Sequence, residues 1–392
     1  MRKAYKCRAY PDDVQQAILN RTFGCIRVVW NTTLAERHRL WRTERRRLPN
    51  NFLTEIKRRP ELVFLNEVSS VPLQQSLRHQ DKAFSTFFAK RARYPRFKSR
   101  YSRQSAHYAR SAFSMRGGVL RIAKTLAPLK FVWSWSNAEL EDLDPTMVVV
   151  SRDTDGRWYV TFCVEVKTNE PLSKAEKAVG VDLGIKDFAV TSDAARIANP
   201  KLLARRARQL ARYQRRLSRC QKGSANRIKA KAKVARAHRK VRQARQDFLH
   251  RTSTRLVREN DVIVIEDLAV KNMVRNRRLA RAISDCGWGE FRRQLEYKCE
   301  WYGREFVVID RFYPSSKTCS FCGHLLSQLS LGTRHWTCPD CGTRHDRDVN
   351  AAKNILAAGL AVSACGVDVR HNGTTRVQSA VKQESQALRL WG

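Results

Sequence analysis

Residues 318–355 read TCSFCGHLLSQLSLGTRHWTCPDCGTRHDRDVNAAKNI, and this stretch contains the two features around which the rest of the chain is interpreted. The first is a pair of Cys-x2-Cys motifs, Cys319 with Cys322 and Cys338 with Cys341, separated by fifteen residues. Each motif offers two thiolates to one tetrahedral ion, and the glycine directly after each pair permits a tight knuckle. We therefore expect these cysteines to hold one structural Zn²⁺ with no open coordination position.

The second feature is Asp348, which opens an expected helix just after the second cysteine pair. Two other acids end apolar segments that are typical of strands: Asp182 follows 178–181 and Glu266 follows 261–265. Singly, such acids are more often turn or capping residues. Their order, a strand Asp, a later strand Glu and a final helix Asp, is that of the RNase H-like nucleases. In that arrangement converged carboxylates hold two Mg²⁺ about 3.5 to 4 Å apart and promote phosphodiester cleavage.

Other catalytic chemistries lack their motifs here. The chain has no GxxxxGK[ST] loop, no HExxH, no GxSxG, and no pair of histidines flanking an apolar residue of the kind that tyrosine relaxases use. Metal-dependent phosphodiester chemistry is therefore the interpretation that the acids favour.

The charge balance predicts a polyanionic partner. Lys and Arg number 76 against 36 Asp and Glu, which gives a net charge of +40 over 392 residues. Residues 201–246 hold 18 Lys/Arg and no acid, and in 90–103 basic residues alternate with aromatic ones. Basic groups neutralise phosphates and aromatic rings stack on exposed bases, so both stretches favour nucleic acid. The alternatives are a solvated helix face and a basic loop whose aromatics enter the core.

The expected compartment follows from features that the sequence lacks. No run of about 18 apolar residues could span a membrane, and the first twenty residues lack the apolar core of a secretory signal. Eleven cysteines, scattered apart from the two pairs, argue against a disulfide framework. We expect a protein of the cytosol or nucleoid, without a membrane partner.

Periodicity predicts a β domain interrupted by helices in the first half. The first ten residues read as a strand, and a helix begins near Val14, with Gly24 as a possible break. A second helical block covers 71–92. Strands then follow at 119–122, 130–135, 147–150 and 158–166, with turns at Gly117-Gly118 and Asp155-Gly156. These strands indicate a small β-barrel or an open sheet. If the first strand of the chain also pairs with this sheet, the helices between them are an insertion into one β domain.

The second half opens with a hairpin of strands at 178–181 and 188–191 and continues into the basic helical stretch. An amphipathic helix around 288–302 leads into a strand at 306–309, and the final helix is expected over 349–358.

Six motifs in order resemble the TnpB family, the RNA-guided nucleases of bacterial insertion sequences and relatives of compact type V CRISPR effectors. They extend over 179–355 and read VGVDLGIKDFAV, RQDFLH, IEDLAVKNM, SDCGWGEFRRQLEYKCEWYG, YPSSKTCSFCG and WTCPDCGTRHDRDVNAAKNI. The segments RAYPDDVQQ and LQQSLRHQDKAFSTFF in the first half add weaker support.

The resemblance implies a role for each acid. Asp182, Glu266 and Asp348 match the catalytic carboxylates of a RuvC-like domain that binds two Mg²⁺. Asp346 is the other candidate for the third catalytic carboxylate. The family pattern places the metal ligand directly before the x-N-A-A that opens the helix, and this selects Asp348.

The resemblance also implies a multidomain α/β fold: an N-terminal wedge-like β-barrel with an inserted helical recognition domain, and a C-terminal RNase H-like (RuvC) domain with an inserted zinc ribbon. The expected boundaries are 1–10 and 104–170 for the wedge-like domain, 11–103 for the recognition domain, 175–316 and 344–360 for the nuclease domain, 317–343 for the ribbon and 361–392 for a disordered tail.

The implied activity is RNA-guided, Mg²⁺-dependent cleavage of double-stranded DNA beside a short transposon-adjacent motif. The guide RNA would derive from the insertion-sequence end and bind one protein monomer, and base pairing would read the target. Gln74, Gln75 and Ser114 lie where the motif-reading surface is expected; a glutamine can pair with adenine, which favours an A·T-rich motif. Further nucleic-acid contacts are expected from Arg93, Arg96 and Lys98.

Three alternatives remain open at this point. A nuclease-dead RNA-guided repressor would share the fold, a transposase would use the same metal chemistry for strand transfer, and a zinc-ribbon DNA-binding factor would have no enzymatic activity. The last leaves the three acids unexplained.

Overall fold

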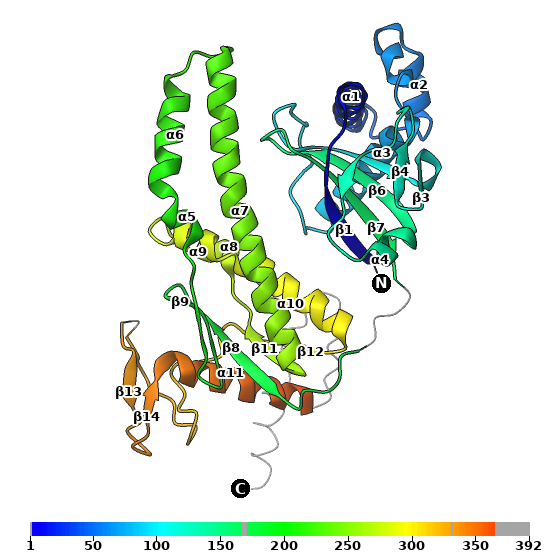
Figure 1. Cartoon of the computed structure of the whole chain (residues 1–392). Coiled ribbons are helices and arrows are strands. Elements are labelled where there is room, and N and C mark those ends of the chain that lie inside the picture. Colours follow the sequence, from blue (N-terminus) through cyan, green and yellow to red (C-terminus); the bar gives the residue numbers. More distant parts are fainter. Residues whose placement is uncertain (1, 167–170, 331, 365–392) are drawn as a thin grey trace. The chain divides into compact units, whose positions relative to one another are not determined.

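The computed structural model of the chain describes residues 2–166, 171–330 and 332–364 (Figure 1). The chain divides into two compact units, Met1–Thr168 with Gln221–Ala235 and Asn169–Cys220 with Arg236–Gly392. Each unit combines helices with a five-stranded sheet, so the predicted multidomain α/β class is confirmed. No described helix is long and apolar enough to cross a membrane.

The first unit is built on an antiparallel sheet. Its strands are β1 (Arg2–Ala9), β2 (Gln104–Ala109), β5 (Phe131–Val132), β6 (Pro145–Arg152) and β7 (Trp158–Glu165), in the spatial order β2-β6-β7-β1-β5. The first strand pairs with β7 along its whole length, as expected for a sheet that the helices interrupt. Strands β2 and β5 are edges with no pairing to each other among the described residues, so the sheet is open and does not close into the predicted barrel.

Helix α1 (Asp13–Thr43) shows how local sequence sets the start of an element. The Asp12 carboxylate accepts a hydrogen bond from the Gln15 N–H, and the Gln15 side chain accepts one from the Asp12 N–H, which forms a capping box. The predicted break at Gly24 is wrong, since the helix continues without interruption. An interior glycine costs only about 1 kcal/mol, and the buried Phe23 beside it stacks on Trp158 of β7.

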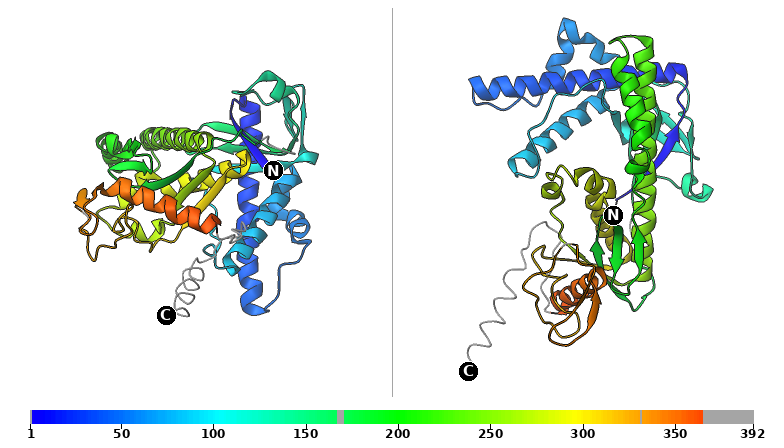
Figure 2. Two further views of the ribbon diagram at one scale, coloured as in Figure 1. Left: turned by 90° about the horizontal axis from the view of Figure 1, so that it is seen from below. Right: turned by 90° about the vertical axis from the view of Figure 1, so that its left-hand side faces the viewer.

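Helix α3 (Ser70–Phe88) lies beside α1 (Figure 2), and the two helices share one hydrophobic core with the sheet. Side chains from α1, from the sheet and from the segment between them meet in this single cluster. The remaining elements of the unit are α2 (Phe52–Arg58), a 3₁₀ helix (Pro60–Asn66), α3 (Ser70–Phe88), a 3₁₀ turn (Arg110–Ala112), the hairpin β3 (Phe113–Arg116) with β4 (Val119–Ile122), and α4 (Asn137–Glu141).

The second unit contains a mixed sheet in the order β10-β9-β8-β11-β12. Strands β8, β11 and β12 are parallel, whereas β9 and β10 run antiparallel to their neighbours. The strands are β8 (Ala178–Leu183), β9 (Asp187–Thr191), β10 (Arg196–Ala198), β11 (Val262–Glu266) and β12 (Glu305–Ile309).

Helices cover both faces of this sheet. Ile263 and Ile265 of β11 pack into a core with residues of α7, α9 and α10, whereas Val264 packs with Ile355 of α11 on the opposite face. A strand that is buried on both faces reads as a continuous apolar run, as VIVI does here. The helices of this half of the sequence are α5 (Leu202–Arg205), α6 (Ala207–Arg219), α7 (Ala225–Glu259), α8 (Val270–Met273), α9 (Ala280–Cys286), α10 (Trp288–Tyr302) and α11 (Arg347–Ala364). The first residues of α7, up to Ala235, belong to the first unit.

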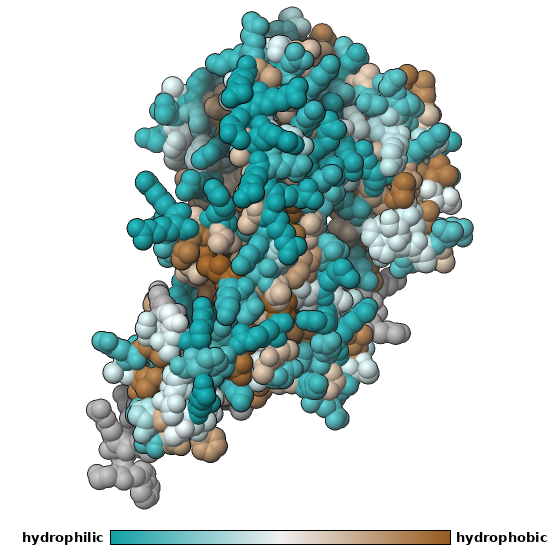
Figure 3. Space-filling model, turned by 60° about the vertical axis from the view of Figure 1, so that its left-hand side comes forward, coloured by the Kyte–Doolittle hydropathy of each residue, from teal (hydrophilic) through white to brown (hydrophobic). Residues whose placement is uncertain are grey.

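The basic stretch of the sequence forms exposed helices. Most Lys and Arg side chains of α6 and of the first turns of α7 are solvent-exposed, and hydrophilic residues gather over this region of the surface (Figure 3). Four arginines of α6, Arg212, Arg215, Arg216 and Arg219, line one shallow groove.

The end of the chain differs from the prediction in one respect. Helix α11 continues to Ala364, so 361–364 are helical and do not belong to a disordered tail. The helix extends because Gly359 lets it approach Val264 and the residues that follow are mostly good helix formers. The rest of the predicted tail, 365–392, lies outside the described residues.

Candidate active site and cysteine cluster

Two of the predicted carboxylates lie at the carboxyl edge of the mixed sheet. Strands β8 and β11 are parallel neighbours, with Val181 paired to Ile265. Asp182 and Glu266 are the next residues in each strand, so their backbones lie side by side. The carboxyl edge of an open α/β sheet is where such folds hold their ligands.

Helix α11 brings the third carboxylate to the same edge. Gly180 of β8 faces α11 so closely that a Cβ there would lie 2.1 Å from the Ala352 carbonyl oxygen. Asp348 precedes Ala352 by about one helical turn and belongs to the first turn of α11. The absence of a side chain at Gly180 is therefore what allows α11 to set Asp348 over the strand that carries Asp182.

The three carboxylates interact electrostatically. Burial, then the charge of Glu266 and then that of Asp348, raises the pKa of Asp182 to about 7, against a smaller opposing effect of Arg347 and Arg334. Burial also raises the pKa of Glu266, and a hydrogen bond from Ser315 partly opposes that rise. A buried carboxyl whose pKa is raised in this way beside two other acids is a candidate functional residue. Among the described residues, the cysteines described below are the only group whose ligand atoms are already close enough together to hold one ion.

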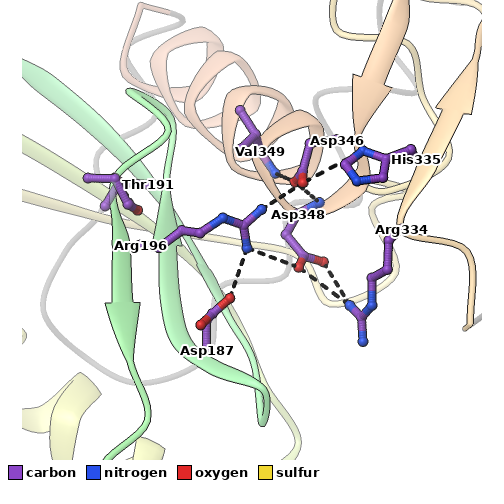
Figure 4. A network of polar contacts seen from close by, with 9 residues as sticks. Asp187, Thr191, Arg196, Arg334, His335, Asp346, Asp348 and Val349 are labelled. Carbon is purple, nitrogen blue, oxygen red and sulfur yellow. Dashed lines mark hydrogen bonds and ion pairs between the residues drawn. The ribbon is translucent and has the colours of Figure 1, made fainter.

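Asp346 and Asp348 are only two residues apart but play different structural parts (Figure 4). Asp346 Oδ1 accepts hydrogen bonds from the N–H groups of Asp348 and Val349, at 3.1 and 3.0 Å, and so caps α11. Its Oδ2 accepts from Arg196 Nη2 at 2.6 Å. Both carboxylate oxygens of Asp348 lie 3.4 Å from Arg334 Nη1.

Glu266 is connected to α11 through Ser315. The Ser315 hydroxyl donates to Glu266 Oε1 at 3.2 Å. The Ser315 carbonyl accepts from Asn354 at 2.7 Å and more weakly from Asn350, and both asparagines also donate to the Thr318 carbonyl. The helix that carries Asp348 thus also anchors the segment that holds Glu266.

The four predicted metal-ligating cysteines form one compact cluster. The Sγ atoms of Cys319, Cys322, Cys338 and Cys341 all lie within 4.8 Å of one another. The two knuckles repeat one hydrogen-bonding pattern, in which Gly323 and Gly342 at positive φ donate their N–H groups to the carbonyls of the first cysteine of each pair. Four thiolates with this spacing suit tetrahedral Zn²⁺, and β13 (His335–Thr337) and β14 (Arg344–Asp346) form the hairpin beside them.

A histidine supports this cluster from the side. His345 Nε2 lies 3.0 Å from Cys319 Sγ, and its ring packs against Trp336 with centroids 4.7 Å apart. Contacts of this kind orient ligating residues. The cysteine spacing in the sequence gave no sign of this contact.

The predicted nucleic-acid residues are distributed over three elements of the first unit. On α3, Gln74 is exposed, whereas Gln75 is only 7% exposed because it faces the core side of the helix. Ser114 is exposed on β3. Arg93 and Arg96 are exposed in the segment between α3 and β2.

That segment is anchored to α1. Trp30 Nε1 donates to the Arg96 carbonyl at 2.9 Å, and Asn31 exchanges two hydrogen bonds with the backbone of Lys98. The Lys98 amine lies 4.0 Å from the centre of the Trp30 ring, and burial lowers its pKa. Of the aromatic residues here, Tyr94 packs against Phe84 and Phe87, while Phe97 and Tyr101 are 58% and 65% exposed.

Sequence reasoning missed Arg196, Arg334, Ser315 and the asparagines of α11. A weak signal existed for the asparagines, since Asn350 and Asn354 have the i, i+4 spacing that places both on one helix face. Nothing in the local sequence distinguished Arg196 from the many other arginines.

Three family descriptions match successive parts of the chain. Residues 161–277 match the family OrfB_IS605, "Probable transposase", and 288–355 match "Cas12f1-like, TNB domain". Residues 1–46 match a family described as "Helix-turn-helix domain", where this structure has a strand followed by one continuous helix.

Curated relatives match nearly the whole chain. A "Putative RNA-guided DNA endonuclease" of Streptomyces pristinaespiralis is 54% identical over 98% of this chain and 97% of its own length. InsQ of Escherichia coli, which bears the same description, is 33% identical over 93% of this chain and 94% of its own length. Among solved structures, a Cas12f1-sgRNA-target DNA complex aligns with a TM-score of 0.54 and 15% identity over 87% of this chain and 82% of that one, which indicates a shared fold. The chain therefore belongs to the TnpB-like family of insertion-sequence proteins whose curated members bear the name of RNA-guided DNA endonucleases.

Proposed function

We propose that this protein is an RNA-guided, Mg²⁺-dependent DNA endonuclease of an insertion sequence. One observation carries the proposal: Asp182 and Glu266 end neighbouring parallel strands, and Asp348 in the first turn of α11 is near enough that its charge, after burial and the charge of Glu266, helps to raise the pKa of Asp182 to about 7. The match over nearly the whole chain to relatives named as RNA-guided DNA endonucleases supports the assignment of a guide RNA and a DNA substrate.

The donor set fits a hard divalent cation. Asp182, Glu266 and Asp348 offer only carboxylate oxygens, and a bound cation would favour the charged form of Asp182, whose pKa is raised first by burial and then by the charges of Glu266 and Asp348. Two Mg²⁺ held by these residues would supply an activated water and neutralise the charge that develops on the leaving oxygen. The chain's own contribution is positioning, since Ser315 orients Glu266 and the cap at Asp346 orients Asp348.

We assign the nuclease chemistry to a RuvC-like, RNase H-like domain formed by 175–316 and 344–360, with 317–343 as an inserted ribbon that holds one structural Zn²⁺. The ligands are Cys319, Cys322, Cys338 and Cys341. We assign the wedge-like domain, which is built on the open sheet, to 1–10 and 104–170, and the recognition domain to 11–103. The order of the three acids on two parallel strands and one helix supports the nuclease assignment.

We assign one guide RNA to one protein monomer in the bacterial cytosol, with double-stranded DNA as the substrate. The net charge of +40 and the exposed arginines of α6 support polyanion binding. Gln74 and Ser114, both exposed, are assigned to the transposon-adjacent motif, and the exposed Arg93 and Arg96 to the nucleic-acid backbone. The expected contacts of Gln75 and Lys98 would need these side chains to leave the core side of α3 and the Trp30 ring, respectively.

The test begins with protein purified from cells that contain the insertion-sequence end. We expect copurified RNA that derives from this end, Mg²⁺-dependent cleavage of DNA that matches the RNA, and loss of cleavage without loss of RNA or DNA binding in Asp182→Ala. Cleavage by Asp182→Ala at the wild-type rate would refute the site. Binding of DNA without cleavage by wild-type protein would indicate a repressor, and strand-transfer products formed without RNA would indicate a transposase.

A further inference from the structure

Arg196, on the edge strand β10, joins three elements around the candidate active site. Its Nη1 donates to Asp187 at the start of β9 at 2.8 Å, and its Nη2 donates to Asp346 at the end of β14 at 2.6 Å. Only the planar, five-donor guanidinium can serve two carboxylates in fixed directions at once. The residue therefore connects the sheet to the start of α11 (Figure 4).

The strand register shows why Arg196 reaches this place. Val190 of β9 pairs with Asp182 on one side and with Arg196 on the other. Residues paired across neighbouring strands project from the same face, so Asp182 and Arg196 share a face. It is the face that α11 covers, because Gly180, two residues before Asp182, lies against Ala352.

The distances show whether Arg196 interacts more strongly with Asp346 or with Asp348. Arg196 lies 3.8 Å from Asp348, beyond hydrogen-bonding range, whereas its 2.6 Å contact with Asp346 is a charge-assisted hydrogen bond. Asp348 has its own cation in Arg334 at 3.4 Å. Arg196 thus acts on Asp348 mainly through Asp346, whose other oxygen holds the N–H groups of Asp348 and Val349.

We propose that Arg196 is the positioning residue of Asp348, acting through the Asp346 cap of α11, and that Asp346 is not a metal ligand. The inference rests on the proposed nuclease function. A cap fixed from the sheet sets the direction of the first turn of α11, and with it the distance between the Asp348 and Asp182 carboxylates. Positioning partners of metal ligands contribute about 10- to 100-fold to metal affinity or activity.

The test compares Arg196→Gln, Arg196→Lys, Asp346→Asn and the Arg196→Gln/Asp346→Asn double variant. Asn is itself a good capping residue, so Asp346→Asn keeps the cap and removes only the charge that Arg196 holds. The control is Arg251→Gln, which breaks an exposed i, i+4 ion pair with Asp247 on α7. All variants are prepared as complexes with guide RNA.

Two measurements do not depend on cleavage: hydrogen exchange at the Asp348 and Val349 amides without metal, and Mn²⁺ affinity by electron paramagnetic resonance. We expect Arg196→Gln to exchange faster at both amides, to bind Mn²⁺ about 10-fold more weakly and to cleave about 10- to 100-fold more slowly at saturating DNA, with an unchanged DNA Kd. Arg196→Lys should recover part of each loss, and the control should match wild type.

The double variant distinguishes an effect of Arg196 that passes through Asp346 from one that is independent of Asp346. If Arg196 acts through Asp346, the double variant loses no more than the worse single variant, because both changes break one connection. Losses that multiply, or unchanged exchange at the Asp348 and Val349 amides in Arg196→Gln, would overturn the inference. If wild-type protein itself fails to bind Mn²⁺ or to cut DNA, the proposed function fails instead.

Discussion

Replacing Gly180 by alanine tests whether the approach of α11 to β8 builds the candidate active site. The added Cβ would lie 2.1 Å from the Ala352 carbonyl oxygen, 2.6 Å from the Leu356 nitrogen and 2.8 Å from the Leu356 Cβ. Two of these atoms belong to the helix backbone, so no side-chain rotation relieves the clash.

The size of the effect follows from the overlap. Contacts below 3.0 Å are essentially never formed by real Cβ atoms, so α11 must retreat from β8 by about 1 Å. Overpacking of this kind typically costs about 1–3 kcal/mol, and the retreat also loosens the cluster of Val264 with Ile355. Asp348 lies one turn from Ala352 and moves with the helix. A misplacement of about 1 Å can lower a catalytic rate about 100-fold.

The assay pairs urea unfolding with single-turnover cleavage at saturating guide RNA and DNA. The matched control is Gly289→Ala on α10, where an added Cβ meets no atom within 4 Å and the helix gains up to about 1 kcal/mol. We expect Gly180→Ala to be destabilised and to cut about 100-fold more slowly while the control cuts normally. Wild-type stability and cleavage in Gly180→Ala would refute the view that this contact sets the site.

Three further outcomes are expected. Cys322→Ser should reduce the zinc content from one ion per chain to nearly none by metal analysis and destabilise the ribbon, whereas Cys220→Ser, outside the cluster, should retain the ion. The pKa of Asp182 rises from near 4 in the unfolded chain to about 7 in the folded protein. Its contribution to the free energy of unfolding is therefore fully present below pH 4 and is lost as the pH rises through 7. Metal-free wild type should therefore lose on the order of 2–4 kcal/mol of unfolding free energy between pH 4 and 8 relative to Asp182→Asn, by urea titration. Ser315→Ala should weaken Mg²⁺-dependent cleavage about 10-fold through Glu266, while Ser315→Thr, which keeps the hydroxyl, should retain most of it.

Local patterns were sufficient to predict the elements that carry the site. The VIVI run ending in Glu266 predicted a buried strand, and that strand is β11. The cysteine spacing predicted one cluster, and the four thiols form it. Each of these inferences needs only neighbouring residues, because a strand period and a metal knuckle are encoded within a few positions.

Contacts between distant segments were beyond local patterns. Arg196 and Asp346 are 150 residues apart in the sequence, so their pairing depends on which strands lie side by side. The burial of Gln75 depends on how α3 rotates against the sheet, and the open edges of the first sheet depend on where β2 and β5 end. Such features follow from tertiary packing, which overrides local preference.

The proposed ribbon and the candidate active site both contact α11, so the cysteine cluster can influence the proposed catalysis without touching the substrate. Asn350 and Asn354 hold the Thr318 carbonyl, directly before the first ligating cysteine, and Asn350 also accepts from the Ser320 N–H within that knuckle. From the other end of the ribbon, Arg334 pairs with Asp348. If the cysteine cluster unfolds, the two asparagines lose the Thr318 carbonyl as a partner and Asp348 loses its ion pair with Arg334. No ligand of the proposed Mg²⁺ site has changed in that case. A closed four-thiolate site is suited to this role, because it stabilises a fold and leaves no position for a reactant.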